Sequence, residues 1–168
     1  MAEPLTPELR DLLALRLVPG LGPRLTAALL RRFGSATAVR RATASQLRQV
    51  PQIGTKLSLD FAAALAAVDL DRECGLLEEH NVHLIVLGTP EYPTALAEIA
   101  DPPQLLFVRG NLTPTDNRAV AIVGSRGCTG YGRRITAGLA AGLVRAGYTV
   151  ISGLPRGTGL HKTSSSLR

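Results

Sequence analysis

A glycine-containing turn with a basic residue is the segment of this sequence best suited to chemistry. Residues 119–123 form an apolar, partly β-branched run, typical of a buried strand of a parallel sheet. Gly124, Ser125 and Arg126 follow this run directly, and a helical pattern begins a few residues later. Backbone N–H groups at a helix start, together with the positive end of the helix dipole, attract anions. The sequence therefore predicts a phosphate-binding turn.

The turn does not match the common nucleotide-binding motifs. A Walker A loop needs lysine and a hydroxyl residue after its last glycine, but Arg133 and Arg134 stand there. The dinucleotide fingerprint G-x-G-x-x-G has Ile135 in place of its third glycine. A mononucleotide ligand and a purely structural turn both stay open as alternatives. The charge of Arg133 and Arg134, next to the turn, favours the phosphate backbone of a nucleic acid over a mononucleotide.

Charge is distributed in blocks along the 168 residues. Residues 1–67 carry nine Lys and Arg against four Asp and Glu, whereas residues 68–118 carry three against nine. From residue 119 onward there are seven basic side chains and no carboxylate. Basic blocks on folded domains favour polyanionic partners, so nucleic acid is the expected partner class. An arginine-rich composition without any function is the alternative for the first block.

The elements of the first block form two similar copies. Leucines at helical spacing end at the segment VPGLG, residues 18–22, and a second helix follows to residue 33. The segment VPQIG, residues 50–54, repeats the pattern thirty-two residues later and precedes another helix. This pattern resembles paired helix–hairpin–helix motifs, so Gly20 and Gly22 are expected as accessory DNA contacts. A purely structural or protein-docking helical domain is the alternative.

The second half of the chain alternates strands and helices. Strands are expected at residues 83–87, 105–108, 119–123 and 148–151, with helical segments between them. This order predicts an α/β fold with a parallel sheet, in which ligands bind at the carboxyl ends of strands. Ser152 and Gly153 end one strand as Gly124 ends another. The two strand ends are therefore expected to line one crevice.

At this point the residues resemble a known family, the DNA-processing protein A (DprA/Smf) family. The motifs that carry the resemblance occur in the family's order over roughly residues 5–157: Glu91-Tyr92-Pro93, Asp101-Pro102-Pro103, Gly110 with Leu112, the strand ending in Gly124-Ser125-Arg126, Tyr131-Gly132, and Ser152-Gly153-Leu154. The resemblance implies a helical domain, of the helix–hairpin–helix or SAM-like type, followed by a Rossmann-like domain. Here the parallel sheet of that domain is expected to be incomplete.

The resemblance also implies a function. The family binds single-stranded DNA, protects incoming DNA in natural transformation and loads the RecA recombinase onto it in recombination, and it is not known as an enzyme. Carried over to this chain, Gly124, Ser125 and Arg126 are the expected DNA phosphate-binding turn, with Ser152 and Gly153 beside it. Arg133, Arg134 and Arg156 are expected as accessory contacts. The alternatives are a nucleotide-binding Rossmann-like enzyme, or a helical interaction module with an inactive α/β remnant.

The chain departs from the family after residue 154, where Pro155 and Arg156 replace the expected continuation. The expected organisation is a helical domain at 1–67, the first half of a Rossmann-like domain at 68–157, and an atypical polar tail at 158–168. Since the second half of the domain is missing from this pattern, the chain is interpreted as truncated or decayed, and a homodimer is not expected.

Composition excludes several other classes. The N-terminus lacks the apolar segment of a secretory signal, and no apolar run reaches the length of a membrane span. Cys74 and Cys128 lie far apart without metal-ligand spacing, so no metal, cofactor or catalytic group is predicted. The expected location is the cytoplasm, with single-stranded DNA and RecA as partners.

Overall fold

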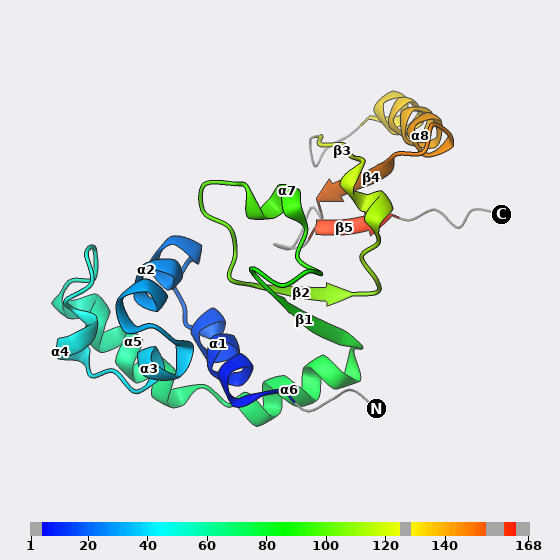
Figure 1. The fold of residues 1–168 in the computed structure, drawn as a ribbon. Helices are drawn as coiled ribbons and strands as arrows, with labels where there is room; N and C mark the ends of the chain where they lie inside the picture. Colours follow the sequence, from blue (N-terminus) through cyan, green and yellow to red (C-terminus); the bar gives the residue numbers. More distant parts are fainter. Residues whose placement is uncertain (1–4, 125–128, 154–159, 164–168) are drawn as a thin grey trace. The chain divides into compact units, whose positions relative to one another are not determined.

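The computed structural model of the chain describes residues 5–124, 129–153 and 160–163. The chain divides into two compact units, Met1–Asn111 and Leu112–Arg168, which are described separately below (Figure 1). The domain boundary expected at residue 67 lies inside the first unit. The second unit begins shortly before the strand that leads into the glycine turn.

The first unit is mostly helical and contains one pair of strands. Its elements in chain order are α1 (Pro7–Leu17), α2 (Pro23–Phe33), α3 (Ala36–Arg40), α4 (Ala44–Leu47), α5 (Thr55–Ala67), α6 (Leu70–Glu79), β1 (Val82–Val86), α7 (Thr94–Ala97) and β2 (Leu105–Arg109). The helices expected from leucine spacing are therefore present as α1, α2 and α5.

The second unit contains a small sheet and one long helix. Its elements are the 3-10 helix η1 (Pro114–Asn117), β3 (Ala119–Ala121), α8 (Gly130–Arg145), β4 (Thr149–Gly153) and β5 (Leu160–Thr163). The strands have the order β3-β4-β5. The α/β fold class is confirmed, because helices precede and separate strands and the pair β3 and β4 is parallel.

Strand direction differs from the single parallel sheet expected from the sequence. β1 and β2 form a sheet of their own and pair antiparallel, with Val82 opposite Arg109 and Val86 opposite Leu105. Parallel pairing requires a long crossover, usually a helix. The connection between β1 and β2 contains only the four-residue α7, whereas the sixteen-residue α8 connects β3 to β4. Only the second connection is therefore a full helical crossover.

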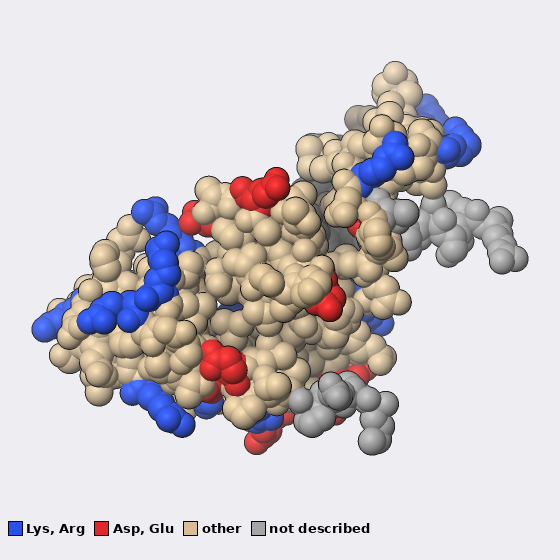
Figure 2. All heavy atoms as spheres, in the orientation of Figure 1, with Lys and Arg blue, Asp and Glu red and all other residues tan. Residues whose placement is uncertain are grey.

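Charged side chains of the first unit are unevenly distributed over its surface. In Figure 2, Lys and Arg side chains gather over the helices at the left of the view. Most of them come from α2, from the segment around α3 and α4, and from the start of α5. The charge blocks of the sequence thus correspond to a basic helical surface.

The two expected hairpins, residues 18–22 (the first hairpin) and 50–54 (the second hairpin), have matching geometry. In the first, the Leu21 N–H donates to the Val18 carbonyl at 3.2 Å, and in the second Ile53 donates to Val50 at 3.1 Å. Gly20 has φ +79° and Gln52 has φ +75°. Gln52 therefore adopts the left-handed conformation of the glycine it replaces, which is uncommon for a residue with a side chain.

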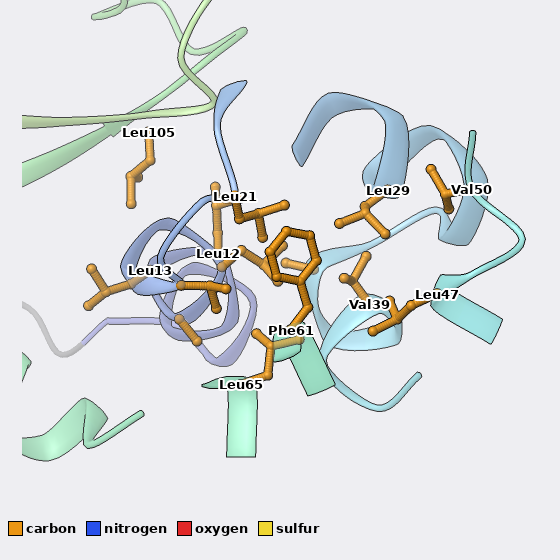
Figure 3. Packing of buried hydrophobic residues seen from close by; sticks show 14 of the residues in the cluster. Leu12, Leu13, Leu21, Leu29, Val39, Leu47, Val50, Phe61, Leu65 and Leu105 are labelled. Atoms are coloured by element: carbon orange, nitrogen blue, oxygen red, sulfur yellow. The ribbon is translucent and has the colours of Figure 1, made fainter. Parts of the chain in front are cut away.

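The two copies pack against each other. Phe61 of α5 is 1% exposed, and a Cβ placed on Gly20 of the first hairpin would lie 3.9 Å from its ring. The core around Phe61 also contains leucines of α1 and α2 (Figure 3). Leu105 of β2 belongs to the same buried cluster, at 3% exposure. The helical bundle and the strand pair thus share one hydrophobic core.

Candidate functional site

The parallel pair β3 and β4 positions the predicted phosphate-binding corner. Ala119 lies opposite Thr149 and Ala121 opposite Ile151, and the Ile122 N–H donates to the Ile151 carbonyl at 2.8 Å. Because the strands run in the same direction in this register, their carboxyl ends lie at the same edge of the sheet. That Gly124 lies near the end of β4 stays a prediction.

The predicted site residues are placed in part. Gly124 and Gly153 are exposed and Ser152 is half-buried. Ser125, Arg126 and Arg156 lie outside the described residues. Gly124 is the last described residue before the predicted turn, and Thr129 is the first one after it.

One feature of this edge was not predicted. Residues 160–163, expected as part of a polar tail, form β5 and pair antiparallel with β4. In this pairing Ser152 lies opposite His161 and Gly153 opposite Leu160. β5 therefore pairs with one edge of β4 at Ser152 and Gly153, the two residues expected to line the crevice. β3 pairs with the other edge of β4.

The start of α8 contributes the helical side of the corner. Thr129 is its N-cap, and the Thr129 hydroxyl accepts a hydrogen bond from the Gly132 N–H at 3.1 Å. One of the backbone N–H groups at this helix start therefore already has a partner within the chain. The side chains of Arg133 and Arg134 are exposed in the first two turns of the helix. No carboxylate lies in this first turn, so the positive helix end is not neutralised there.

Tyr131, which belongs to one of the motifs that carry the family resemblance, is a candidate binding residue beyond the predicted site residues. It is the second residue of α8, and its side chain is 69% exposed. Tyr148 is less exposed, at 37%, and the Arg118 guanidinium lies over its ring, with the guanidinium carbon 5.0 Å from the ring centroid. An exposed aromatic ring beside a basic turn is a stacking surface for a nucleic-acid base. The spacing of Tyr131 from Arg126 was the available sequence signal.

A polar network holds the strand that carries Ser152 and Gly153. The Thr149 hydroxyl donates to Asp116 Oδ1 at 3.0 Å, and the Thr149 N–H donates to the Arg118 carbonyl at 2.9 Å. Asp116 also accepts a hydrogen bond from the Thr113 N–H at 2.7 Å through its other oxygen. The turn of η1 is therefore fastened to the start of β4, which fixes the register of β3 against β4.

In the first unit, Gly20 and Gly22 occupy the exposed first hairpin. Gly22 and Gly54 are the N-caps of α2 and α5, and neither helix has a side-chain hydrogen bond at its cap. Both helices also lack an acidic residue in the first turn. Both hairpins therefore present a helix start without local negative charge.

A second feature of the first unit was missed from the sequence. A hollow of about 350 Å³ lies between α2 and the second hairpin, lined by Arg24, Ala28, Arg31, Arg32, Pro51 and Gln52. We call it the arginine groove. Its arginines follow the spacing i, i+7, i+8 on α2, which places them on one helix face. That spacing was the signal in the sequence, but the contribution of the second hairpin depends on the fold.

The described residues contain neither a metal-binding cluster nor a membrane-spanning helix. In residues 5–124, 129–153 and 160–163, no group of three or more His, Cys, Asp or Glu side chains is arranged to hold a metal ion. None of the helices in this described part combines the length and apolar character that crossing a membrane would require.

Comparison with known proteins gives the family. The family model of DNA recombination-mediator protein A matches residues 83–168. The protein Smf of Synechocystis sp. is 31% identical over 158 residues, which is 90% of this chain and 39% of that protein. The DNA processing protein DprA of Bacillus subtilis is 34% identical over 89 residues, which is 52% of this chain and 30% of that protein.

A shorter match is to a protein of another name. UvrABC system protein C of Parafrankia sp. is 51% identical over 49 residues, covering 29% of this chain and 7% of that protein. The chain spans about two fifths of the Synechocystis relative and a smaller share of the other two. The family model covers half of the chain and includes the corner formed by β3, the turn and α8. The chain therefore belongs to the DNA recombination-mediator protein A family, as its motifs predict.

Proposed function

We propose that this chain binds single-stranded DNA at the corner formed by Gly124, Ser125 and Arg126, with Ser152 and Gly153 beside it. The observation that supports the proposal is the parallel register of β3 and β4, in which Ala121 lies opposite Ile151, so that both strands end toward the same edge of the sheet. Glycines there allow a phosphate to approach the backbone closely. The family name, which refers to a mediator of DNA recombination, supports a DNA ligand.

The surroundings of the corner favour a nucleic-acid strand over a free nucleotide. Residues 119–168 contain seven basic side chains and no carboxylate, so no general base of the Asp or Glu type is available in this segment. The exposed ring of Tyr131 offers stacking to an unpaired base. Arg133 and Arg134 extend the positive charge along the start of α8. We therefore propose a binding protein and not an enzyme.

The role in the cell follows from the same proposal. The relatives named DNA processing protein DprA and protein Smf support a part in DNA processing. We propose that the bound strand is protected during natural transformation and is passed to RecA, which makes RecA the protein partner. Contacts to phosphates carry no base information, so binding at this corner is independent of sequence.

The experiment is a fluorescence-anisotropy titration of labelled oligo-dT with the full chain at two salt concentrations. We expect the affinity to fall as salt rises, because phosphate contacts release counterions. Arg126→Ala removes the charge at the turn and is expected to reduce the salt slope by roughly one phosphate contact.

The matched control is Arg145→Ala, which removes a charge in the last turn of α8, at the other end of the helix from the turn. Binding of oligo-dT that is weakened equally by both substitutions, or by neither, would contradict the proposed site. Arg156→Ala, tested in parallel, shows whether the accessory contact exists.

A further inference from the structure

The arginine groove of the first unit is a second positively charged surface that the corner in the second unit does not use. Arg24 and Arg31 are exposed, and neither forms an ion pair within the described part of the chain. Arg32 donates from Nη2 to the Gln49 side-chain oxygen at 2.9 Å, so its guanidinium is oriented by an uncharged partner. The groove thus keeps its full positive charge.

Two other arginines of the same unit are paired with carboxylates. Arg40 pairs with Asp11 at 2.7 Å, and Arg10 pairs with Asp71 at 2.5 Å. The unit therefore contains carboxylates able to pair with arginine, but they lie elsewhere. Three arginines around one hollow repel each other, and an anion that lies between them would relieve this repulsion.

The two repeats place further cations at equivalent positions. With the thirty-two-residue offset, Arg24 of α2 corresponds to Lys56 of α5, and each is the second residue of its helix. A cation at a helix start opposes the helix dipole, and acidic residues are preferred there. α1 and α6 follow that preference, with acidic residues in their first turns. α2 and α5 depart from it in the same way.

The hairpin of each repeat lies against a helix of the other repeat. The first hairpin lies against Phe61 of α5, and the second hairpin lies against α2, where Pro51 and Gln52 line the groove. This exchange brings the charged face of α2 beside the hairpin of the other copy. The face from Arg24 to Arg31 spans roughly 10 Å along the helix, at about 1.5 Å per residue. That length matches about three successive phosphates of one DNA strand.

The groove is suited to paired bases and not to a single strand. Its lining contains no aromatic residue. In the described residues up to Ala67 the only aromatic side chains are Phe33, which is half-buried, and Phe61, which is buried. Single-stranded DNA is usually held by stacking of its bases on exposed rings, whereas in a duplex the bases already stack on each other. We propose that the arginine groove binds the phosphate backbone of double-stranded DNA, as a site separate from the single-strand corner.

The test uses the full chain, a labelled 20-bp duplex of arbitrary sequence and oligo-dT, all titrated by fluorescence anisotropy. Arg24→Glu with Arg31→Glu is expected to weaken duplex binding by about tenfold or more and to reduce the salt slope by about two. Binding of oligo-dT is expected to change less than threefold, because the corner is untouched. Arg24→Lys with Arg31→Lys keeps the charge and is expected to retain duplex binding.

The control is Arg72→Glu with Arg109→Glu, which changes the net charge equally at two exposed arginines of the same unit that do not line the groove. Circular dichroism verifies that each variant is folded. An equal loss in the control, a loss of oligo-dT binding in place of duplex binding, or no duplex binding by the unaltered chain would each overturn the proposal. Arg126→Ala separates the two proposals, since it is expected to affect oligo-dT alone.

Discussion

The Asp11 carboxylate of α1 and the Arg40 guanidinium of α3 are joined by an ion pair of 2.7 Å. The other oxygen of Asp11 accepts a hydrogen bond from the Thr37 hydroxyl at 2.6 Å. Asp11 is only 9% exposed, so both of its oxygens need these partners. Glu8 adds a contact of the same kind, accepting from the Ala36 N–H at 2.8 Å. These contacts hold α3 against α1. Because α3 is too short to be stable as an isolated helix, it depends on them.

Replacing Asp11 by asparagine is expected to destabilise the first unit. The Asp11→Asn side chain keeps its shape but loses the charge that pairs with Arg40, at an expected cost of about 1–3 kcal/mol. Urea unfolding followed by circular dichroism measures this change. Asp60→Asn on the exposed surface of α5 is the control and should be nearly neutral. An equal effect of the two substitutions would refute the role of the ion pair.

The stability of the first unit is expected to depend on pH through the same group. Burial raises the pKa of Asp11, but the hydrogen bonds from Thr37 and Arg40 outweigh burial, so its pKa lies below the ordinary value. A lowered pKa in the folded state gives stability that is present above the ordinary Asp value and is lost as pH falls below it. Unfolding measured from neutral to acidic pH should show this loss, and Asp11→Asn should show a smaller one.

The hairpin conformations predict opposite effects of two substitutions. Gly20→Ala is expected to destabilise the chain by about 1–2 kcal/mol, because φ +79° is unfavourable for a residue with a Cβ. Space is not the cause, since the added Cβ would make only an ordinary contact with Phe61. Gln52→Gly relieves the same conformation and is expected to stabilise by about 0.5 kcal/mol after the entropy of glycine is subtracted.

A glycine in ordinary helical conformation is the control for this pair. Gly75 lies inside α6, and a Cβ there would contact nothing within 4 Å. Gly75→Ala is therefore expected to stabilise by about 0.5–1 kcal/mol. Thermal unfolding of the three variants measures the order, and a stabilising Gly20→Ala would show that the first hairpin differs from its described geometry.

Tyr131 is expected to contribute to binding of single strands by stacking. Tyr131→Ala should weaken oligo-dT binding by about 1–3 kcal/mol, roughly five- to 150-fold, while Tyr131→Phe keeps the ring and most of the affinity. Leu139→Ala, at an exposed position of the same helix, is the control for loss of surface area. If Tyr131→Ala binds oligo-dT as tightly as the unaltered chain, Tyr131 is not a stacking residue.

Local patterns predicted the elements well. Leucine spacing and the two VP-x-x-G segments fixed α1, α2 and α5, because helix faces and turn residues are encoded over a few neighbouring positions. The strands at 83–87, 105–108 and 148–151 were also predicted within one or two residues. The motif order predicted the family correctly.

Pairings between distant segments were not predictable in the same way. An apolar run indicates a strand but not its partner, so the antiparallel pairing of β1 with β2 was missed. β5 was missed because residues 160–163 show no apolar alternation. Their strand conformation depends on pairing with β4, which the local sequence does not reveal. The arginine groove was missed because α2 and Gln52 are brought together only by the reciprocal packing of the repeats.

Leu105 has a consequence for how the first unit opens. Its side chain extends from β2 into the cluster formed by α1 and its neighbours (Figure 3). Cooperative units of a protein exchange their amide hydrogens together when they open. When β2 detaches, Leu105 leaves the cluster and the buried leucines of α1 become exposed to water. The amides of β2 and of α1 therefore exchange in a single opening event, even though more than eighty residues separate the two segments in the chain.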